Sequence, residues 1–161
     1  MKALILYRSF YGTTRSVAET MAKAITALGH EAVVHDIRTR LPDLAGFDCA
    51  LVGAPTRMAR VNGKVLRVLK RLGKKGFAAK PVAIFDLYGP VPTKPEELEK
   101  GQRWITPGAA GIMERTARDA GLRVFGKVLR CEVAGMRGPL KEREQEKAAE
   151  FAEEFLSGAG P

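Results

Sequence analysis

The sequence predicts one doubly wound α/β domain, in which helices cover both faces of a five-stranded parallel sheet. Short apolar runs alternate with stretches whose apolar residues recur every three or four positions, which is typical of strand–helix–strand units. The first run, residues 3–7, is continuously apolar, as expected of a strand buried on both faces. A chain of 161 residues that is 45% hydrophobic can bury one core. The expected strands are residues 3–7, 32–37, 47–53, 81–87 and 122–133.

The helices are predicted from the spacing of apolar residues between these strands. The residues that mark the first and third helices by this spacing are Val17, Met21, Ile25 and Leu28, and Ile112, Met113, Thr116, Ala117 and Ala120. Buried faces are expected at Val61, Val65, Val68, Leu69 and Leu72 in the second helix and at Phe151, Phe155 and Leu156 in the last one. Gly29 and Gly121 are expected to end the first and third of these helices, and Pro139 is expected near the start of the last one. Each helix therefore has one face that can cover the sheet.

Other local features refine this outline. The strand over residues 32–37 is more polar than the others, which predicts a position at the sheet edge. Gly126 is expected to interrupt the fifth strand. We expect a single domain over residues 1–157, followed by a frayed tail at residues 158–161.

Residues 88–107 form a long, irregular connection that contains four prolines. A connection of this length in a compact domain usually has a functional reason. It is expected to hold one short helix, with Pro95 near its start and Gly101 past its end. Trp104 is interpreted as an anchor for this loop.

The cysteines, the histidines and the N-terminus exclude several classes of protein. Cys49 and Cys131 form no Cys-x-x-Cys pair, so we expect two buried thiols rather than a zinc site or a redox dithiol. His30 and His35 lack partner ligands, so no metal site and no catalytic side chain is predicted. The N-terminal apolar run is too short for a secretion signal, and no run reaches the ~20 residues of a membrane span. A cytoplasmic protein is therefore expected.

Residues 9–14, Ser-Phe-Tyr-Gly-Thr-Thr, connect the first strand to the first helix. Backbone N–H groups at a helix N-terminus, with hydroxyl groups beside them, form an anion site. Gly12 allows the tight turn that such a loop needs. The alternative is that Thr13 or Thr14 only caps the helix. The glycines of dinucleotide and nucleoside-triphosphate loops are missing, which argues against both of those motifs.

Two further turns follow the third and fourth strands. Residues 53–60 read Gly-Ala-Pro-Thr-Arg-Met-Ala-Arg, and residues 86–90 read Asp-Leu-Tyr-Gly-Pro. Because the carboxyl ends of parallel strands meet at one edge of the sheet, we expect the three segments to form one pocket. Tyr88 offers an aromatic face to a planar ring. The pocket is therefore expected to take a flat ligand that carries an anionic group.

In these residues the chain resembles the flavodoxin family: Ser9, Gly12, Thr13 and Thr14, the turn over 53–56, and the pair Tyr88–Gly89. The resemblance implies the strand order 2-1-3-4-5. It also implies FMN, with its phosphate on the first loop and its ring between the other two. The residues expected to contact FMN are Ser9, Tyr11, Gly12, Thr13, Thr14, Pro55, Thr56, Arg57, Met58, Ala59, Tyr88, Gly89 and Pro90. Met58 and Ala59 stand where many family members place an aromatic ring.

One segment carries the whole net charge of +9. It contains nine cations and no acidic residue: Arg57, Arg60, Lys64, Arg67, Lys70, Arg71, Lys74, Lys75 and Lys80. Such a run is either a solvated helix face or a surface that steers an acidic redox protein to dock near residues 57–75. Nucleic acid is disfavoured, because no aromatic residues are interleaved with the cations.

Three functions follow from these expectations. The first, which we favour, is an FMN-binding electron-transfer protein, in which the protein binds and tunes the flavin. The second is an FMN-dependent NAD(P)H or quinone oxidoreductase, with the segment over 88–107 as a wall of the substrate site. The third is a scaffold without FMN that binds an acidic partner or nucleic acid through the basic helix over residues 60–75.

Overall fold

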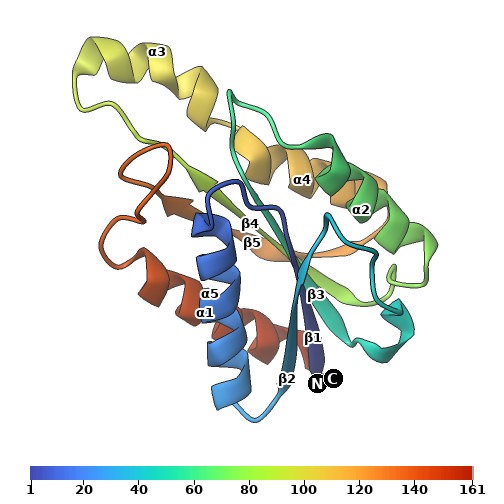
Figure 1. The fold of residues 1–161 in the computed structure, drawn as a ribbon. Helices are drawn as coiled ribbons and strands as arrows, with labels where there is room; N and C mark the ends of the chain where they lie inside the picture. The colour runs from blue at the N-terminus through green and yellow to red at the C-terminus, as the bar shows by residue number, and fades with distance from the viewer. Residues whose placement is uncertain (161) are drawn as a thin grey trace.

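The computed structural model describes residues 1–160, apart from the side chain of Arg103, and it contains one five-stranded parallel sheet (Figure 1). The strands are β1 (Lys2–Tyr7), β2 (Glu31–Asp36), β3 (Cys49–Pro55), β4 (Pro81–Tyr88) and β5 (Arg123–Glu132). Their order is β2-β1-β3-β4-β5, so Leu51 at the centre pairs with Ile5 on one side and Ala83 on the other. The predicted fold class, strand order and edge position of the second strand are confirmed.

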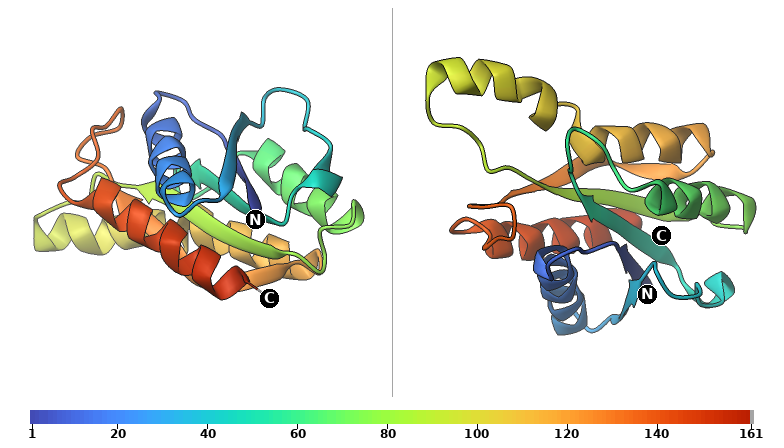
Figure 2. Two further views of the ribbon diagram at one scale, coloured as in Figure 1. Left: turned by 90° about the horizontal axis from the view of Figure 1, so that it is seen from below. Right: turned by 45° about the horizontal axis from the view of Figure 1, so that its top comes forward.

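Helices cover both faces of the sheet, as the alternating pattern predicts. The helices are α1 (Thr13–Ala27), α2 (Gly63–Lys74), α3 (Pro95–Ile105), α4 (Gly108–Asp119) and α5 (Glu144–Ala159), with a short 3₁₀ turn at Leu44–Gly46. Helices α1 and α5 pack side by side on one face, and α2 and α4 pack on the other (Figures 1 and 2). Helix α3 extends away from the sheet in all three views.

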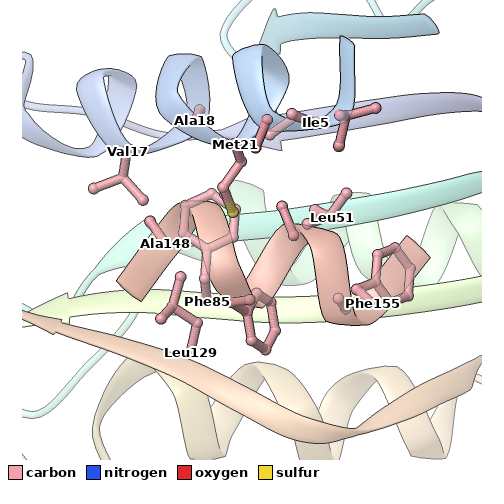
Figure 3. Close-up of a cluster of buried hydrophobic side chains, with 14 of the residues drawn as sticks. Ile5, Val17, Ala18, Met21, Leu51, Phe85, Leu129, Ala148 and Phe155 are labelled. Carbon is pink, nitrogen blue, oxygen red and sulfur yellow. The ribbon is translucent and has the colours of Figure 1, made fainter. Parts of the chain in front are cut away.

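The sheet separates two hydrophobic layers. The layer under α1 and α5 includes Met21, Phe85 and Phe155, which lie between the helices and the strands (Figure 3). The layer under α2 and α4 includes Leu69 and Phe77. These five side chains have essentially no exposed surface. Burial of each such side chain contributes about 1.5–3 kcal/mol to folding, so both faces of the sheet stabilise the domain.

Two predicted features inside the strands are confirmed. The pairing of β4 with β5 changes register between Val82 and Ile84, and their partners are Val124 and Val128. The extra residues of β5 lie around Gly126, which matches the interruption expected there. Both cysteines are buried and unpaired in β3 and β5.

The last helix begins later than predicted. Pro139 lies in the loop before α5, and the helix starts at Glu144. The chain over residues 133–141 pairs with itself and with the end of β5 instead: Val133 bridges Leu140, and the Lys141 N–H donates to the Glu132 carbonyl. These hydrogen bonds hold the chain extended, so a proline suited to a first helical turn does not begin one here. Helix α5 continues to Ala159, and Pro161, in the expected tail, lies outside the described residues.

The prediction that Gly101 ends the helix after Pro95 is wrong. Helix α3 starts at Pro95 as expected but continues to Ile105. A glycine ends a helix when it adopts a positive φ, and Gly101 does not. Its missing side chain instead leaves room for Pro92, whose Cγ would lie 3.3 Å from a Cβ at this position. Packing of the preceding loop therefore accounts for this glycine.

The close approach of β3 to Phe85 gives a first testable prediction. A Cβ on Gly53 would overlap the Phe85 ring, which is completely buried. We expect Gly53→Ala to lower the free energy of unfolding by about 3 kcal/mol, because an overpacked core must shift its side chains or backbone. Urea unfolding measures this loss. Gly46→Ala, where a Cβ meets no atom within 4 Å, is the control and should change stability by less than about 0.5 kcal/mol.

The interaction can be isolated by adding Phe85→Leu. A smaller side chain at position 85 leaves space for the new methyl group, so the costs of Gly53→Ala and Phe85→Leu should not add. Additive costs would contradict the assignment of the Gly53 requirement to the Phe85 ring.

Candidate functional site

The three predicted loops meet at the carboxyl edge of the sheet, where they enclose a cavity of about 590 Å³. This size is in the range of small-molecule and cofactor sites. The cavity is lined by Ser9, Phe10, Tyr11, Thr13, Thr14, Pro55, Thr56, Arg57, Met58, Arg60, Leu87, Tyr88, Gly89, Trp104, Val133 and Met136. The expected pocket between the first, third and fourth strands is therefore present in the fold.

The loop after β1 presents the N-terminal end of α1 without a side-chain cap. Gly12 is the N-cap residue with φ 91°, and neither following threonine caps the helix. The Gly12 N–H donates to the Ser9 hydroxyl at 3.0 Å. The N–H groups of the first turn have no acceptor within the described chain. Thr14 lies on the cavity wall beside them and is almost completely buried. This arrangement suits an anion.

The loop between β5 and α5 also reaches this site, which the sequence did not indicate. The Thr13 hydroxyl donates to the Arg137 carbonyl at 3.4 Å, and the Arg137 guanidinium lies 5.4 Å from the centre of the Tyr11 ring. Val133 and Met136 line the cavity from the same loop. The contact joins residues more than 120 positions apart, so no local sequence signal could have revealed it.

The turn after β3 is tight and strained. The N–H of Arg57 donates to the carbonyl of Arg60, and the N–H of Arg60 donates to the carbonyl of Arg57. Met58 and Ala59 between them adopt φ angles of 51° and 63°, as in a type I′ hairpin turn. A left-handed conformation costs a residue other than glycine about 1–2 kcal/mol. Such strain is concentrated at binding sites, and here it places Met58 at the cavity rim.

Phe10 fixes the arginine that begins this turn. Two guanidinium groups contact its ring, with the Arg8 Cζ 4.0 Å and the Arg57 Cζ 4.1 Å from the ring centre. Each such contact contributes about 0.5–1 kcal/mol at a partly exposed position. The stack joins the loop after β1 to the turn after β3 and holds a positive charge at the cavity wall.

A buried carboxylate organises the floor beneath the cavity. Asp86 is completely buried and accepts hydrogen bonds from the Thr56 hydroxyl at 2.7 Å and from the Ala110 N–H at 3.1 Å. Arg130 forms two more, from Nε at 2.9 Å and from Nη2 at 3.0 Å. The Thr56 hydroxyl in turn accepts from the Ala109 N–H at 2.8 Å. Asp86 thus joins β4, β5, the turn after β3 and the start of α4.

This network decides what Thr56 can offer a ligand. Its hydroxyl bonds to Asp86 and Ala109, and its N–H donates to the Leu87 carbonyl at 2.7 Å. Thr56 was expected to contact FMN, and it does line the cavity. Its polar hydrogens are already used, so it contributes shape and a carbonyl group rather than a hydrogen-bond donor.

Tyr88 ends β4 at the cavity wall with its ring against a cation. The Arg130 guanidinium carbon lies 4.4 Å from the ring centre. Burial raises the pKa of the Tyr88 phenol, and the nearby negative charge of Glu132 raises it further. Tyr88 therefore stays neutral at physiological pH and presents a neutral aromatic face to the cavity.

The rim of the cavity is apolar. Five large hydrophobic side chains are exposed within residues 1–160, and four of them line this one cavity: Tyr11, Met58, Trp104 and Met136. Clustered exposed apolar residues mark binding surfaces. Trp104, interpreted from the sequence as a loop anchor, has 42% of its surface exposed and lies on the wall. Helix α3 brings it there from the long connection.

The structure places the other expected residues in different roles. Gly12 and Ala59 adopt the positive φ angles that their turns require. Pro90 is the next residue after Gly89, which lines the cavity. None of Gly12, Ala59 and Pro90 lines the cavity. Arg60, at the other end of the tight turn, does line it.

Among the residues that the structure describes, the cavity lining contains no histidine, cysteine, aspartate or glutamate. Burial raises the pKa of Cys49 to about 11 and that of Cys131 to about 12, so both thiols are unreactive. The described residues contain no group of three metal-ligating side chains. No helix within residues 1–160 is long and apolar enough to cross a membrane.

An open parallel sheet with a cavity at its carboxyl edge, beside a helix N-terminus, defines a doubly wound α/β protein. Comparison with known proteins identifies the family. Residues 4–116 match the flavodoxin domain, so the chain belongs to the flavodoxin family. Proteins of this family are flavodoxin-like electron-transport proteins that typically bind FMN.

Solved structures agree with this assignment across the whole fold. A flavodoxin from the domain Archaea is 19% identical, with a TM-score of 0.77 and coverage of 99% of both chains. Oxidised flavodoxin 1 from Bacillus cereus is 19% identical, with a TM-score of 0.74 and coverage of 99% of this chain and 100% of that one. At these identities the likeness establishes the fold.

A curated relative matches part of the chain. The NAD(P)H dehydrogenase (quinone) of Cupriavidus metallidurans is 28% identical over 93 residues. The match covers 45% of this chain and 47% of that protein, so it spans about half the length of the relative.

The network around Asp86 yields a second prediction. Gly108 begins α4 with φ 66°, and a Cβ there would overlap Nη2 of Arg130 and lie 3.0 Å from the Thr56 hydroxyl. We expect Gly108→Ala to lower the free energy of unfolding by about 3 kcal/mol, because it adds a clash with the buried ion pair to the cost of a positive φ. Gly121→Ala is the matched control, since Gly121 has φ 79° and open space around it. Its cost in urea unfolding should be about 1 kcal/mol; equal costs would show that the ion pair does not require Gly108.

Proposed function

We propose that this protein binds FMN in the cavity and transfers electrons to or from an acidic redox protein. The observation that carries the proposal is the pairing of two features in one cavity: an uncapped helix N-terminus, and aromatic and apolar side chains in the same lining. An anion and a flat apolar ring in one molecule fit this pair. Membership of the flavodoxin family supports the same ligand.

The residues fit FMN as follows. The N–H groups of Thr13, Thr14 and Arg15 would hold the phosphate, together with the free hydroxyl of Thr14, because they have no acceptor in the described chain. Tyr88 and the turn that carries Met58 would hold the two faces of the ring. Bound FMN supplies the redox chemistry, and the protein orients it and sets its electrostatic surroundings.

The basic surface supports an acidic partner. None of the nine cations from Arg57 to Lys80 forms an ion pair within the described chain. Two hollows run between α2 and the loop after β2, with cations on their walls: Arg40, Lys64, Arg67, Arg71 and Lys75. Arg60, next to Lys64 in this series, lines the cavity. A positive track therefore leads from the cavity along α2, which suits steering of an acidic protein.

An FMN-dependent NAD(P)H or quinone oxidoreductase is the second candidate. The apolar rim with Trp104 and Met136 could contact a planar substrate stacked on the flavin. The partial match to an NAD(P)H dehydrogenase (quinone) supports this candidate. We favour the carrier because, among the described lining residues, only hydroxyl groups such as the phenol of Tyr88 could move a proton.

The visible spectrum of the purified protein tests the proposal. We expect flavin absorbance that stays with the protein on gel filtration. A colourless protein that does not take up added FMN would overturn the proposal and leave a scaffold that binds through its basic helix. Rapid bleaching by NAD(P)H alone would favour the oxidoreductase, whereas bleaching that needs a reduced protein donor would favour the carrier.

The phosphate site gives a third prediction. We expect Thr14→Ala to weaken FMN binding by roughly 1.5–3 kcal/mol, because a hydrogen bond to a charged phosphate is lost. Isothermal titration with FMN measures this change. Thr26→Ala, in the last turn of the same helix, is the control, since that exposed hydroxyl donates only to the Ala22 carbonyl. Unchanged affinity for Thr14→Ala would mean that its hydroxyl does not contact the phosphate.

The distribution of charge gives a fourth prediction. Replacing Arg57 and Arg60 with Gln should make the flavin potential more negative by about 30 mV, equivalent to ~1.4 kcal/mol for a two-electron couple, because cations near the ring stabilise its reduced, more negative form. Replacing Lys70, Lys74 and Lys75 with Gln should leave the potential unchanged, since exposed charges beyond about 8–10 Å are screened.

Replacing Lys70, Lys74 and Lys75 with Gln should instead slow electron transfer with an acidic partner and weaken the dependence of that rate on salt. Potentiometry and stopped-flow measurements separate the two effects. If replacing the two arginines does not change the flavin potential, and replacing the three lysines does not change the salt dependence of the rate, the segment is only a solvated helix face.

A further inference from the structure

We propose that Arg130 is a positioning residue for the flavin ring: held in place by Asp86, it fixes the Tyr88 ring and polarises it so that the site favours reduced flavin. This inference rests on the proposed function. It assigns a role to a residue on β5 that lies behind the cavity wall and belongs to none of the three loops.

The geometry gives Arg130 two different contacts at once. The edge of its guanidinium, through Nε and Nη2, donates to both carboxylate oxygens of Asp86. Its face lies 4.4 Å from the centre of the Tyr88 ring. Arg130 does not line the cavity, whereas Tyr88 does. The tyrosine ring therefore stands between the cation and the ligand space.

The surroundings leave Arg130 little freedom to move away. Asp86 is completely buried, and the Thr56 hydroxyl and the Ala110 N–H hold it from the other side. Gly108 leaves the space that Nη2 occupies. A group locked by packing and by hydrogen bonds of this kind is preorganised, so its effect on the neighbouring ring does not depend on ligand binding.

The electrostatic consequence follows from the ring's π system. An aromatic ring carries negative charge on its faces, and a cation on one face draws that charge toward itself. The face of Tyr88 opposite Arg130 then carries less negative charge than it would without the cation, so it repels an electron-rich ligand less. Reduction makes the flavin more electron-rich, so this face should favour reduced over oxidised FMN. The charge is partly buried, so salt screens it less than it screens the exposed cations of α2.

The test compares variants by their affinity for reduced and for oxidised FMN. Arg130→Met alone strands a buried charge and can prevent folding, so it is combined with Asp86→Asn, which removes both charges and keeps an acceptor for Thr56. We expect the reduced-to-oxidised affinity ratio of this double variant to fall roughly threefold to tenfold. A tenfold change corresponds to about 30 mV in a two-electron potential. Arg130→Lys keeps the charge but loses the planar stack, and should give a smaller fall.

Two controls separate this role from a structural one. Arg118→Met removes an exposed arginine from the last turn of α4, where it pairs with Glu114, and should leave the ratio unchanged. In a Tyr88→Leu background, the Arg130 substitutions should no longer change the ratio, because the ring that carries the effect is gone.

The outcomes are distinct. If the wild-type protein binds no FMN, the proposed function fails. If FMN binds but the Asp86→Asn/Arg130→Met and Arg130→Lys variants keep the wild-type ratio, or change it equally with and without Tyr88, the proposed role of Arg130 is overturned while the proposed function stands.

Discussion

The cavity depends on one ion pair, in which the carboxylate of Asp86 is buried and the guanidinium of Arg130 is partly buried. Asp86 accepts four hydrogen bonds from groups on three other segments, and Arg130 provides two of them. Removing one partner of such a pair leaves an uncompensated buried charge, which typically costs 3–5 kcal/mol. The carboxylate also lies at the N-terminal end of α4, where the helix dipole favours negative charge. This pair therefore sets where the turn after β3 and the end of β4 stand relative to each other.

The rim of the cavity is exposed and apolar, whereas the carboxylate of Asp86 beneath it is buried and charged. Three elements form the rim: the strained turn after β3, helix α3, and the loop between β5 and α5. Their exposed residues include Met58, Trp104 and Met136. Methionine side chains adapt to differently shaped partners. A fixed floor can hold a cofactor in one orientation while an adaptable rim contacts a partner. The charge is also uneven: the nine cations from Arg57 to Lys80, none of which forms an ion pair within the described chain, extend from this rim along α2.

The sequence predicted the strands, the helices and the three loops because each depends on local pattern: apolar runs, helical spacing, and turns at strand ends. The strand order came from the resemblance to the flavodoxin family. The sequence could not predict contacts that depend on packing between distant segments. Pro139 satisfies a rule for helix starts, yet pairing of Val133 with Leu140 keeps it extended. The position of Arg130 could not be predicted for the same reason, because its contact with Tyr88 depends on how β5 packs beside β4.

The central claim is that one cavity holds an anion on α1 and a ring against Tyr88. Amide chemical shifts measured with FMN and with riboflavin, which lacks the phosphate, test it most directly. Both ligands should move the signals of Tyr88 and Gly89, and only FMN should move those of Thr13, Thr14 and Arg15. The same shifts at the first turn of α1 with both ligands, or none at Tyr88, would contradict the account.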